Sequence, residues 1–221
     1  MNKKSILILS LAIVLVFTLT ACNLSQFLPT GKTNTTSTDT EVLFQDDFSK
    51  SSSGWDKWSG DSGSTDYVDG TYQIMVNDSQ YDLWANPGEN FTDVSVEVDA
   101  VMVSGPEDND FGILCRYVDV ENYYFGIISS DGYYAIGTLI DGNQQIIGDN
   151  MQPSDAINTG FKSNRIRFDC VGSTLSLYVN GTLLDQQTDS NFSSGDVGLM
   201  AGTFDIGGAQ IAFDNFVVSK P

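Results

Sequence analysis

The 221-residue sequence contains no histidine and few basic residues, and both shortages exclude classes of function. Without imidazole there can be no Ser/His/Asp or Cys/His catalysis, no imidazole zinc site and no histidine pH switch. Ten Lys and Arg against 29 Asp and Glu give a formal net charge of −19. Nucleic acid is therefore not an expected partner, because phosphate binding depends on clustered basic side chains. Carboxylate chemistry, oxygen-ligated metals and binding without catalysis remain.

The first residues have the pattern of an export signal. Lys3 and Lys4 precede an apolar or small run over 6–21, which is too short to span a bilayer comfortably. The run ends in Leu19-Thr20-Ala21-Cys22, which resembles the bacterial lipobox. We predict a lipoprotein signal peptide over 1–21 and a lipid on Cys22. The alternatives are an uncleaved anchor, or an ordinary signal in which the cysteine is incidental.

Residues 22–40 are rich in Ser and Thr and show no apolar periodicity. Such a segment cannot bury enough surface to fold, so we predict a flexible tether. The protein would be exported and anchored to the bacterial cell membrane, facing outside the cytoplasm. Its negative charge leaves the lipid as the only expected attachment to the membrane.

Residues 41–221 carry the pattern of β-strands. Apolar and polar residues alternate over 93–104 and 174–179, which is typical of half-buried strands, and Asn/Asp-Gly pairs mark the turns. Segments 122–129 and 133–140 are predicted to form a hairpin across Asp131-Gly132. Helical periodicity is absent from this region. The expected fold is all-β: one antiparallel, two-sheet jelly-roll β-sandwich over 41–221.

Six short motifs are spread over this region: Asp46-Asp47-Phe48, Ser53-Gly54-Trp55, Asn90-Phe91-Thr92-Asp93-Val94, Tyr123-Tyr124-Phe125, Leu177-Tyr178-Val179-Asn180-Gly181 and Phe213-Asp214-Asn215-Phe216-Val217-Val218. Together they resemble those of concanavalin A-like jelly rolls, closest to bacterial laminin-G-like and 3-keto-disaccharide hydrolase-like domains. The resemblance covers roughly residues 42–219 and implies two curved sheets with a face or rim that binds sugars. Lectins, glycoside hydrolases and adhesion modules all use this fold, so the resemblance indicates fold more than activity.

Two further cysteines, Cys115 and Cys170, each share a strand face with apolar residues. Adjacent strands would bring them within disulfide range, and export permits the bond. We predict a disulfide here, with two buried free thiols as the alternative.

The sequence offers one weak catalytic pattern and one set of metal ligands. Laminarinase-like enzymes carry alternating acids on one strand, and Glu97-Val98-Asp99 begins that pattern without its third acid. An exposed acidic strand face is the alternative. Asp46, Asp47 and Asp214 lie near the two ends of the sandwich, where a structural calcium ion could bind, although solvated turns explain them too. No cofactor is required.

Exposed aromatic side chains would supply stacking surfaces for sugars. Adjacent tyrosines point to opposite faces of a strand, so only one of each pair can line a given surface. Core packing is the alternative for each. The candidate ligand-binding residues are Trp58, Trp84, Tyr124 and Tyr133.

The predicted function is a membrane-anchored lipoprotein whose sandwich binds carbohydrate or another cell-surface ligand without catalysis. Two alternatives stay open. One is a glycoside or 3-keto-disaccharide hydrolase that uses carboxylates, and the other is a protein-adhesion or structural module.

Overall fold

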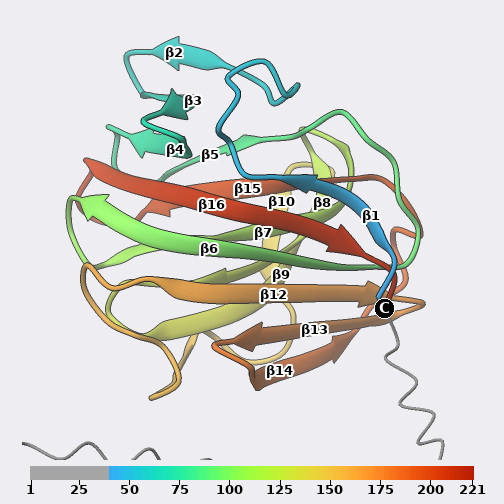
Figure 1. The fold of residues 1–221 in the computed structure, drawn as a ribbon. Helices are drawn as coiled ribbons and strands as arrows, with labels where there is room; N and C mark the ends of the chain where they lie inside the picture. Colours follow the sequence, from blue (N-terminus) through green and yellow to red (C-terminus); the bar gives the residue numbers. More distant parts are fainter. Residues whose placement is uncertain (1–39) are drawn as a thin grey trace, which may run out of the picture. The chain divides into compact units, whose positions relative to one another are not determined.

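The computed structural model describes residues 40–221, which form two antiparallel β-sheets and no helix (Figure 1). No helix in this part of the chain is long and apolar enough to cross a membrane. The predicted signal peptide (1–21), Cys22 and nearly all of the predicted tether (22–40) lie outside the described residues. The predicted all-β, two-sheet fold is confirmed.

The larger sheet has nine strands in the order β14-β13-β12-β6-β16-β4-β3-β2. Strand β1 pairs with the second half of β16, beside the half that pairs with β4. The strands are β1 (Val42–Asp46), β2 (Trp58–Gly60), β3 (Gly63–Val68), β4 (Thr71–Val76), β6 (Val94–Ser104), β12 (Asn164–Val171), β13 (Thr174–Val179), β14 (Thr182–Thr188) and β16 (Ala209–Ser219).

The smaller sheet has seven strands in the order β10-β9-β8-β7-β15-β5, and β11 also pairs with β9. In Figure 1 it lies behind the larger sheet. The predicted hairpin forms as β8 and β9, joined by residues 129–132. The strands are β5 (Tyr81–Ala85), β7 (Asn109–Asp119), β8 (Asn122–Ile128), β9 (Tyr133–Ile140), β10 (Asn143–Ile146), β11 (Gln152–Pro153) and β15 (Asp196–Thr203).

The main core lies between the two sheets and takes alternate residues from the long strands of both. On β6, Val94, Val96 and Val98 are buried at 1% exposure or less, as the period-two pattern predicts. Cys115 on β7 and Cys170 on β12 are joined by a disulfide with a Cα–Cα distance of 6.8 Å. Because β7 and β12 belong to different sheets, the bond links the two layers, whereas the sequence suggested adjacent strands.

Candidate functional site

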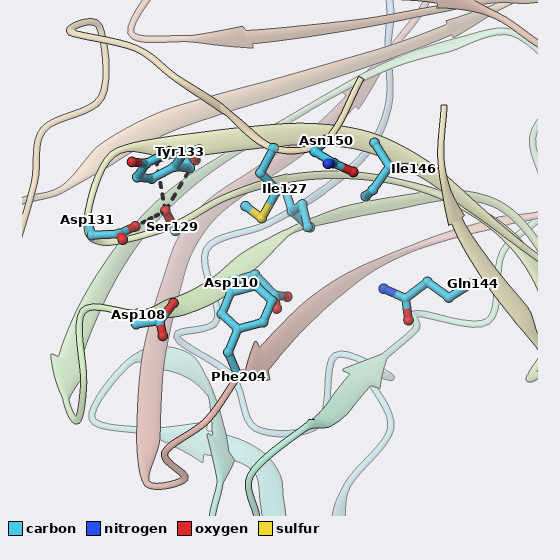
Figure 2. A pocket seen from close by; sticks show the side chains of 11 residues that line it. Asp108, Asp110, Ile127, Ser129, Asp131, Tyr133, Gln144, Ile146, Asn150 and Phe204 are labelled. Carbon is cyan, nitrogen blue, oxygen red and sulfur yellow. Dashed lines mark hydrogen bonds between the residues drawn. The ribbon is translucent and has the colours of Figure 1, made fainter. Parts of the chain in front are cut away.

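A hollow lies on the face of the seven-stranded sheet that points away from the main core, and Figure 2 shows the side chains that line it. Its volume is about 700 Å³, which is within the range typical of small-ligand sites. We call it the sheet cavity. It is lined by Asp108, Asp110, Ile127, Ser129, Asp131, Tyr133, Gln144, Ile146, Asn150, Met151 and Phe204.

A second apolar cluster forms the floor beside the cavity. On β8, Tyr124 and Ile128 face the main core, so Tyr123, Phe125 and Ile127 face the opposite side of the sheet. Both faces of this strand are therefore apolar, which is unusual for a sheet with one solvated face. The buried members of the cluster are Leu114, Tyr123, Phe125, Ile127, Ala135 and Met200.

The segment after β9 builds one wall of the cavity. Strands β10 and β11 both pair with the free edge of β9, at opposite ends of that strand. The intervening residues therefore run along that edge of the sheet. Ile146 and Met151 pack against the second apolar cluster, and Asn150 adds a polar group to the lining.

Two carboxylates stand side by side next to this cluster. Strand β15 lies between β5 and β7, and Gly202 pairs with Asp82 on one side and Asp110 on the other. A Cβ on Gly202 would overlap Asp82 Oδ1 and lie 2.7 Å from Asp110 Oδ2. The absence of a side chain at residue 202 thus leaves room for both acids. We call Asp82 and Asp110 the acid pair.

Burial makes the acid pair difficult to ionise. It raises the pKa of Asp82 to about 6. Burial and then the neighbouring Asp82 charge raise the pKa of Asp110 well above its ordinary value. Asp110 is only 5% exposed, and its Oδ1 has no hydrogen-bond partner within residues 40–221. Unpaired buried polar atoms are rare in folded proteins, and a carboxyl group with a strongly raised pKa that lines a cavity is a candidate functional group.

The turn from β8 to β9 fixes the rim of the cavity. The Ser129 hydroxyl donates a hydrogen bond to the Asp131 carboxylate and accepts one from the Tyr133 amide at 2.9 Å. The backbone adds a bond from the Gly132 amide to the Ser129 carbonyl at 3.1 Å. Tyr133 itself stays 40% exposed. Figure 2 shows Asp108, Asp131 and Tyr133 toward one end of the cavity and Gln144 toward the other.

The four aromatic residues predicted to bind ligand lie in different parts of the structure. Tyr133 lines the sheet cavity, and Trp84 packs half-buried against the second apolar cluster on the same face. Tyr124 was expected at a ligand surface, but its ring lies in the main core, where its hydroxyl bonds to the Asp189 carboxylate and the Phe192 amide. This correction follows from strand alternation, which places Tyr123 rather than Tyr124 on the outer face.

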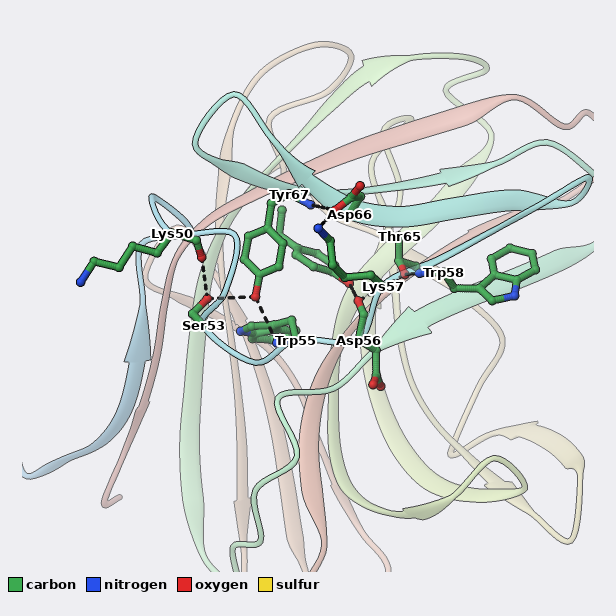
Figure 3. Close-up of polar contacts among 10 residues, drawn as sticks. Lys50, Ser53, Trp55, Asp56, Lys57, Trp58, Thr65, Asp66 and Tyr67 are labelled. Carbon is green, nitrogen blue, oxygen red and sulfur yellow. Dashed lines mark hydrogen bonds and ion pairs between the residues drawn. The ribbon is translucent and has the colours of Figure 1, made fainter.

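Trp58 is 45% exposed but belongs to β2, at the end of the other sheet. Figure 3 shows its indole directed away from Trp55 and Tyr67. Trp55 is buried against Phe48 and Phe216 in the main core. Trp58 is thus exposed on a different sheet from Tyr133 and is not part of the lining of the sheet cavity.

Glu97 and Asp99 lie on β6, in the nine-stranded sheet, away from the sheet cavity. Arg165 on β12 contacts both carboxylates, at 3.1 Å and 3.4 Å. The Asn215 side chain also donates to Asp99 at 2.9 Å. Hydrogen bonds and ion pairs on a partly exposed sheet face account for both acids.

The predicted calcium ligands are not brought together. Asp46 and Asp47 line one hollow, with Asp46 accepting bonds from the Phe48 amide and the Ser53 hydroxyl. Asp214 lines a different hollow. Residues 40–221 contain no group of three or more carboxylate or thiol side chains placed to hold a metal ion. Calcium binding stays a prediction without a located site.

The acid pair was missed from the sequence. Asp82 alternates with Trp84 on β5, which hinted that both point to one face of a strand. No short motif connects Asp82 with Asp110 or Gly202, because their proximity depends on the pairing of three strands that are distant in the sequence.

Comparison with known proteins identifies the fold. No family model matches the sequence, and no curated protein matches it. Among solved structures, the carbohydrate-binding module CBM66 from Bacillus subtilis aligns with a TM-score of 0.61 and 19% identity, over 76% of this chain and 96% of that one.

A galectin-like protein of unknown function from Bacillus subtilis aligns with a TM-score of 0.59 and 11% identity, over 81% and 96% of the two chains. A LamA variant from Z. galactanivorans in complex with laminaritriose and laminaritetraose aligns with a TM-score of 0.55 and 12% identity, over 81% of this chain and 99% of that one. At these identities the likeness establishes a concanavalin A-like or galectin-like β-sandwich, a fold shared by carbohydrate-binding modules and glycosidases.

Proposed function

We propose that the protein binds carbohydrate in the sheet cavity. The observation that carries the proposal is an exposed tyrosine, Tyr133, beside carboxylate and amide groups on an apolar floor. Sugars present apolar ring faces and polar hydroxyls, so this combination suits them. The known carbohydrate-binding and glycosidase proteins on the same fold support the choice of ligand class.

Screening the chain against a glycan array and then measuring affinity by calorimetry tests this proposal. Tyr133→Ala and Trp58→Ala form a matched pair, because both side chains are comparably exposed and only Tyr133 lines the cavity. Tyr133→Ala is expected to weaken binding about tenfold or more, and Trp58→Ala to leave it unchanged. Absence of binding to any glycan would favour a protein-adhesion or structural role.

Glycoside hydrolysis is the second candidate, and the acid pair favours it. Glycosidases use two carboxyl groups, one of which is protonated when the reaction begins, and the raised pKa of Asp110 meets that need. Turnover of a bound glycan that is lost in Asp82→Asn and Asp110→Asn, but kept in Glu97→Gln, would promote this function above binding alone.

Membrane attachment through Cys22, with residues 22–40 as a tether, is a separate proposal that rests on the lipobox resemblance. Mass spectrometry of the mature N-terminal peptide tests it. A diacylglyceryl mass on Cys22 is expected, and Cys22→Ser is expected to release the protein from the membrane. An unmodified cysteine in an exported protein would contradict it.

A further inference from the structure

The sheet cavity is acidic, and none of the residues of 40–221 that line it is basic. Asp108, Asp110 and Asp131 line it, and Asp82 lies across Gly202 from Asp110. Five of the basic residues in 40–221 pair with acids elsewhere: Lys57 with Asp66, Arg116 with Asp93, Arg165 with Glu97, Arg167 with Asp169 and Lys220 with Glu41. None of these five basic side chains therefore forms an ion pair with Asp82 or Asp110.

The lack of a positively charged partner is clearest at Asp110. Buried carboxylates in proteins are normally paired with a positive group or hydrogen-bonded on every oxygen. Asp110 is 5% exposed and lines the cavity, yet its Oδ1 has no partner in the described part of the chain. Its neighbour across Gly202 is a second acid, which repels it rather than neutralising it. A positively charged donor is the group that would satisfy this arrangement.

A small organic cation fits the site better than a metal ion does. Calcium takes six to eight oxygen ligands. In contrast, residues 40–221 place no third carboxylate or thiol with the acid pair for a metal ion. A primary ammonium has three N–H donors and needs only a few acceptors, which the two carboxylates supply.

We infer that the acid pair selects sugars that carry a free amino group, an inference that rests on the proposed carbohydrate function. The ammonium would bind at Asp110 and Asp82, with the sugar ring near Tyr133 and the apolar floor. An N-acetylated sugar loses the charge and two of the three N–H donors. Sugars that carry carboxylate or sulfate groups would be repelled by the same acids.

Calorimetry with two oligosaccharides of equal length tests the inference: oligomers of glucosamine and of N-acetylglucosamine. The glucosamine oligomer is expected to bind about tenfold tighter or more, as for a hydrogen bond between charged groups. Asp110→Asn should remove about that factor for the glucosamine oligomer and leave the acetylated oligomer within about twofold.

The net charge of −19 attracts any polycation, so the controls must separate this general attraction from the site. Asp61→Asn removes the same charge from the exposed turn between β2 and β3, and is expected to leave both affinities within about twofold. Gly202→Ala keeps every charge but places a methyl group between the two acids, and is expected to weaken the glucosamine oligomer selectively. Circular dichroism verifies that each variant is folded.

The outcomes separate the two proposals. Equal affinity for the two oligomers, or equal losses in Asp110→Asn and Asp61→Asn, would overturn amine selection while carbohydrate binding stands. Binding of neither oligomer, with no hit on the glycan array, would overturn both. A lysine oligomer that binds as tightly as the glucosamine oligomer, with the same sensitivity to Asp110→Asn, would overturn the assignment to sugars.

Discussion

Asp82 and Asp110 face the same point from the two strands that flank β15, and Gly202 between them has no side chain to separate them. Burial raises the pKa of both carboxyl groups, and the Asp82 charge raises the pKa of Asp110 further. The folded protein therefore retains protons that the unfolded chain releases at about pH 4. Folding stability consequently falls as pH rises from about 4 through 6 and above.

Asp110→Asn is expected to remove much of this loss. At pH 8 the variant should be more stable than the wild type by about 1–3 kcal/mol, and at pH 4 the difference should be small. For a domain of this size each kcal/mol raises Tm by about 2–4 °C. Thermal unfolding at both pH values measures the effect, with Asp61→Asn as the control. Parallel pH profiles for wild type and Asp110→Asn would contradict the account.

The disulfide between Cys115 and Cys170 should contribute substantially to stability. It closes a loop with a sequence separation of 55 and joins the two sheets. Such a loop contributes about 4 kcal/mol by restricting the unfolded chain. Urea unfolding with and without reductant is expected to show this loss in the wild type. The double variant Cys115→Ala/Cys170→Ala should have the same unfolding midpoint as the reduced wild type, and reductant should not change it. An unchanged midpoint in the reduced wild type would contradict this contribution.

Tyr124 is expected to matter for stability alone. Its hydroxyl joins the Asp189 carboxylate and the Phe192 amide next to the main core. Tyr124→Phe keeps the ring, so it should cost about 1–2 kcal/mol of unfolding free energy through the lost hydrogen bonds. Glycan affinity should stay unchanged. A large loss of affinity without a loss of stability would restore Tyr124 as a binding residue.

Glu97 and Asp99 should be dispensable for binding and for any turnover. Both contact Arg165 on a partly exposed sheet face, where ion pairs contribute about 0–1 kcal/mol. Glu97→Gln and Asp99→Asn are therefore expected to change Tm by no more than a few degrees. Loss of a measurable enzymatic activity in either variant would contradict the placement of function in the sheet cavity.

Tryptophan fluorescence should report the site directly. Of the three tryptophans, Trp55 is buried in the main core, Trp58 is exposed on β2, and Trp84 packs against the second apolar cluster. Binding of the glycan is expected to change the tryptophan emission of the wild type and of Trp58→Phe equally. Trp84→Phe should lose most of the change. The reverse pattern would place the ligand near β2.

The sequence predicted the fold well because β-strands show apolar/polar alternation and turns show Asn/Asp-Gly pairs, and both can be recognised within a few residues. The alternation over residues 93–104 gave the core face of β6, and the turn at Asp131-Gly132 gave the β8–β9 hairpin. The outer face of β8 was harder, since both of its faces are apolar and alternation cannot then distinguish core from ligand surface. That ambiguity explains why Tyr124 was expected at the site.

The candidate site was predicted only in part. Trp84 and Tyr133 were named from their residue type, but the acid pair depends on the order of β5, β15 and β7 in the sheet. Gly202 gave no separate signal, because its importance lies in the space it leaves between two side chains. Long-range strand pairing of this kind is not encoded in any local motif.

The most direct test of carbohydrate binding in the sheet cavity is an NMR titration of the ¹⁵N-labelled chain with the glycan selected by the array. The largest amide shifts are expected at residues 108–110, 129–133 and 144–151, which surround the cavity. Shifts confined to β2 and β3, or to the outer face of β6 and β12, would contradict the account.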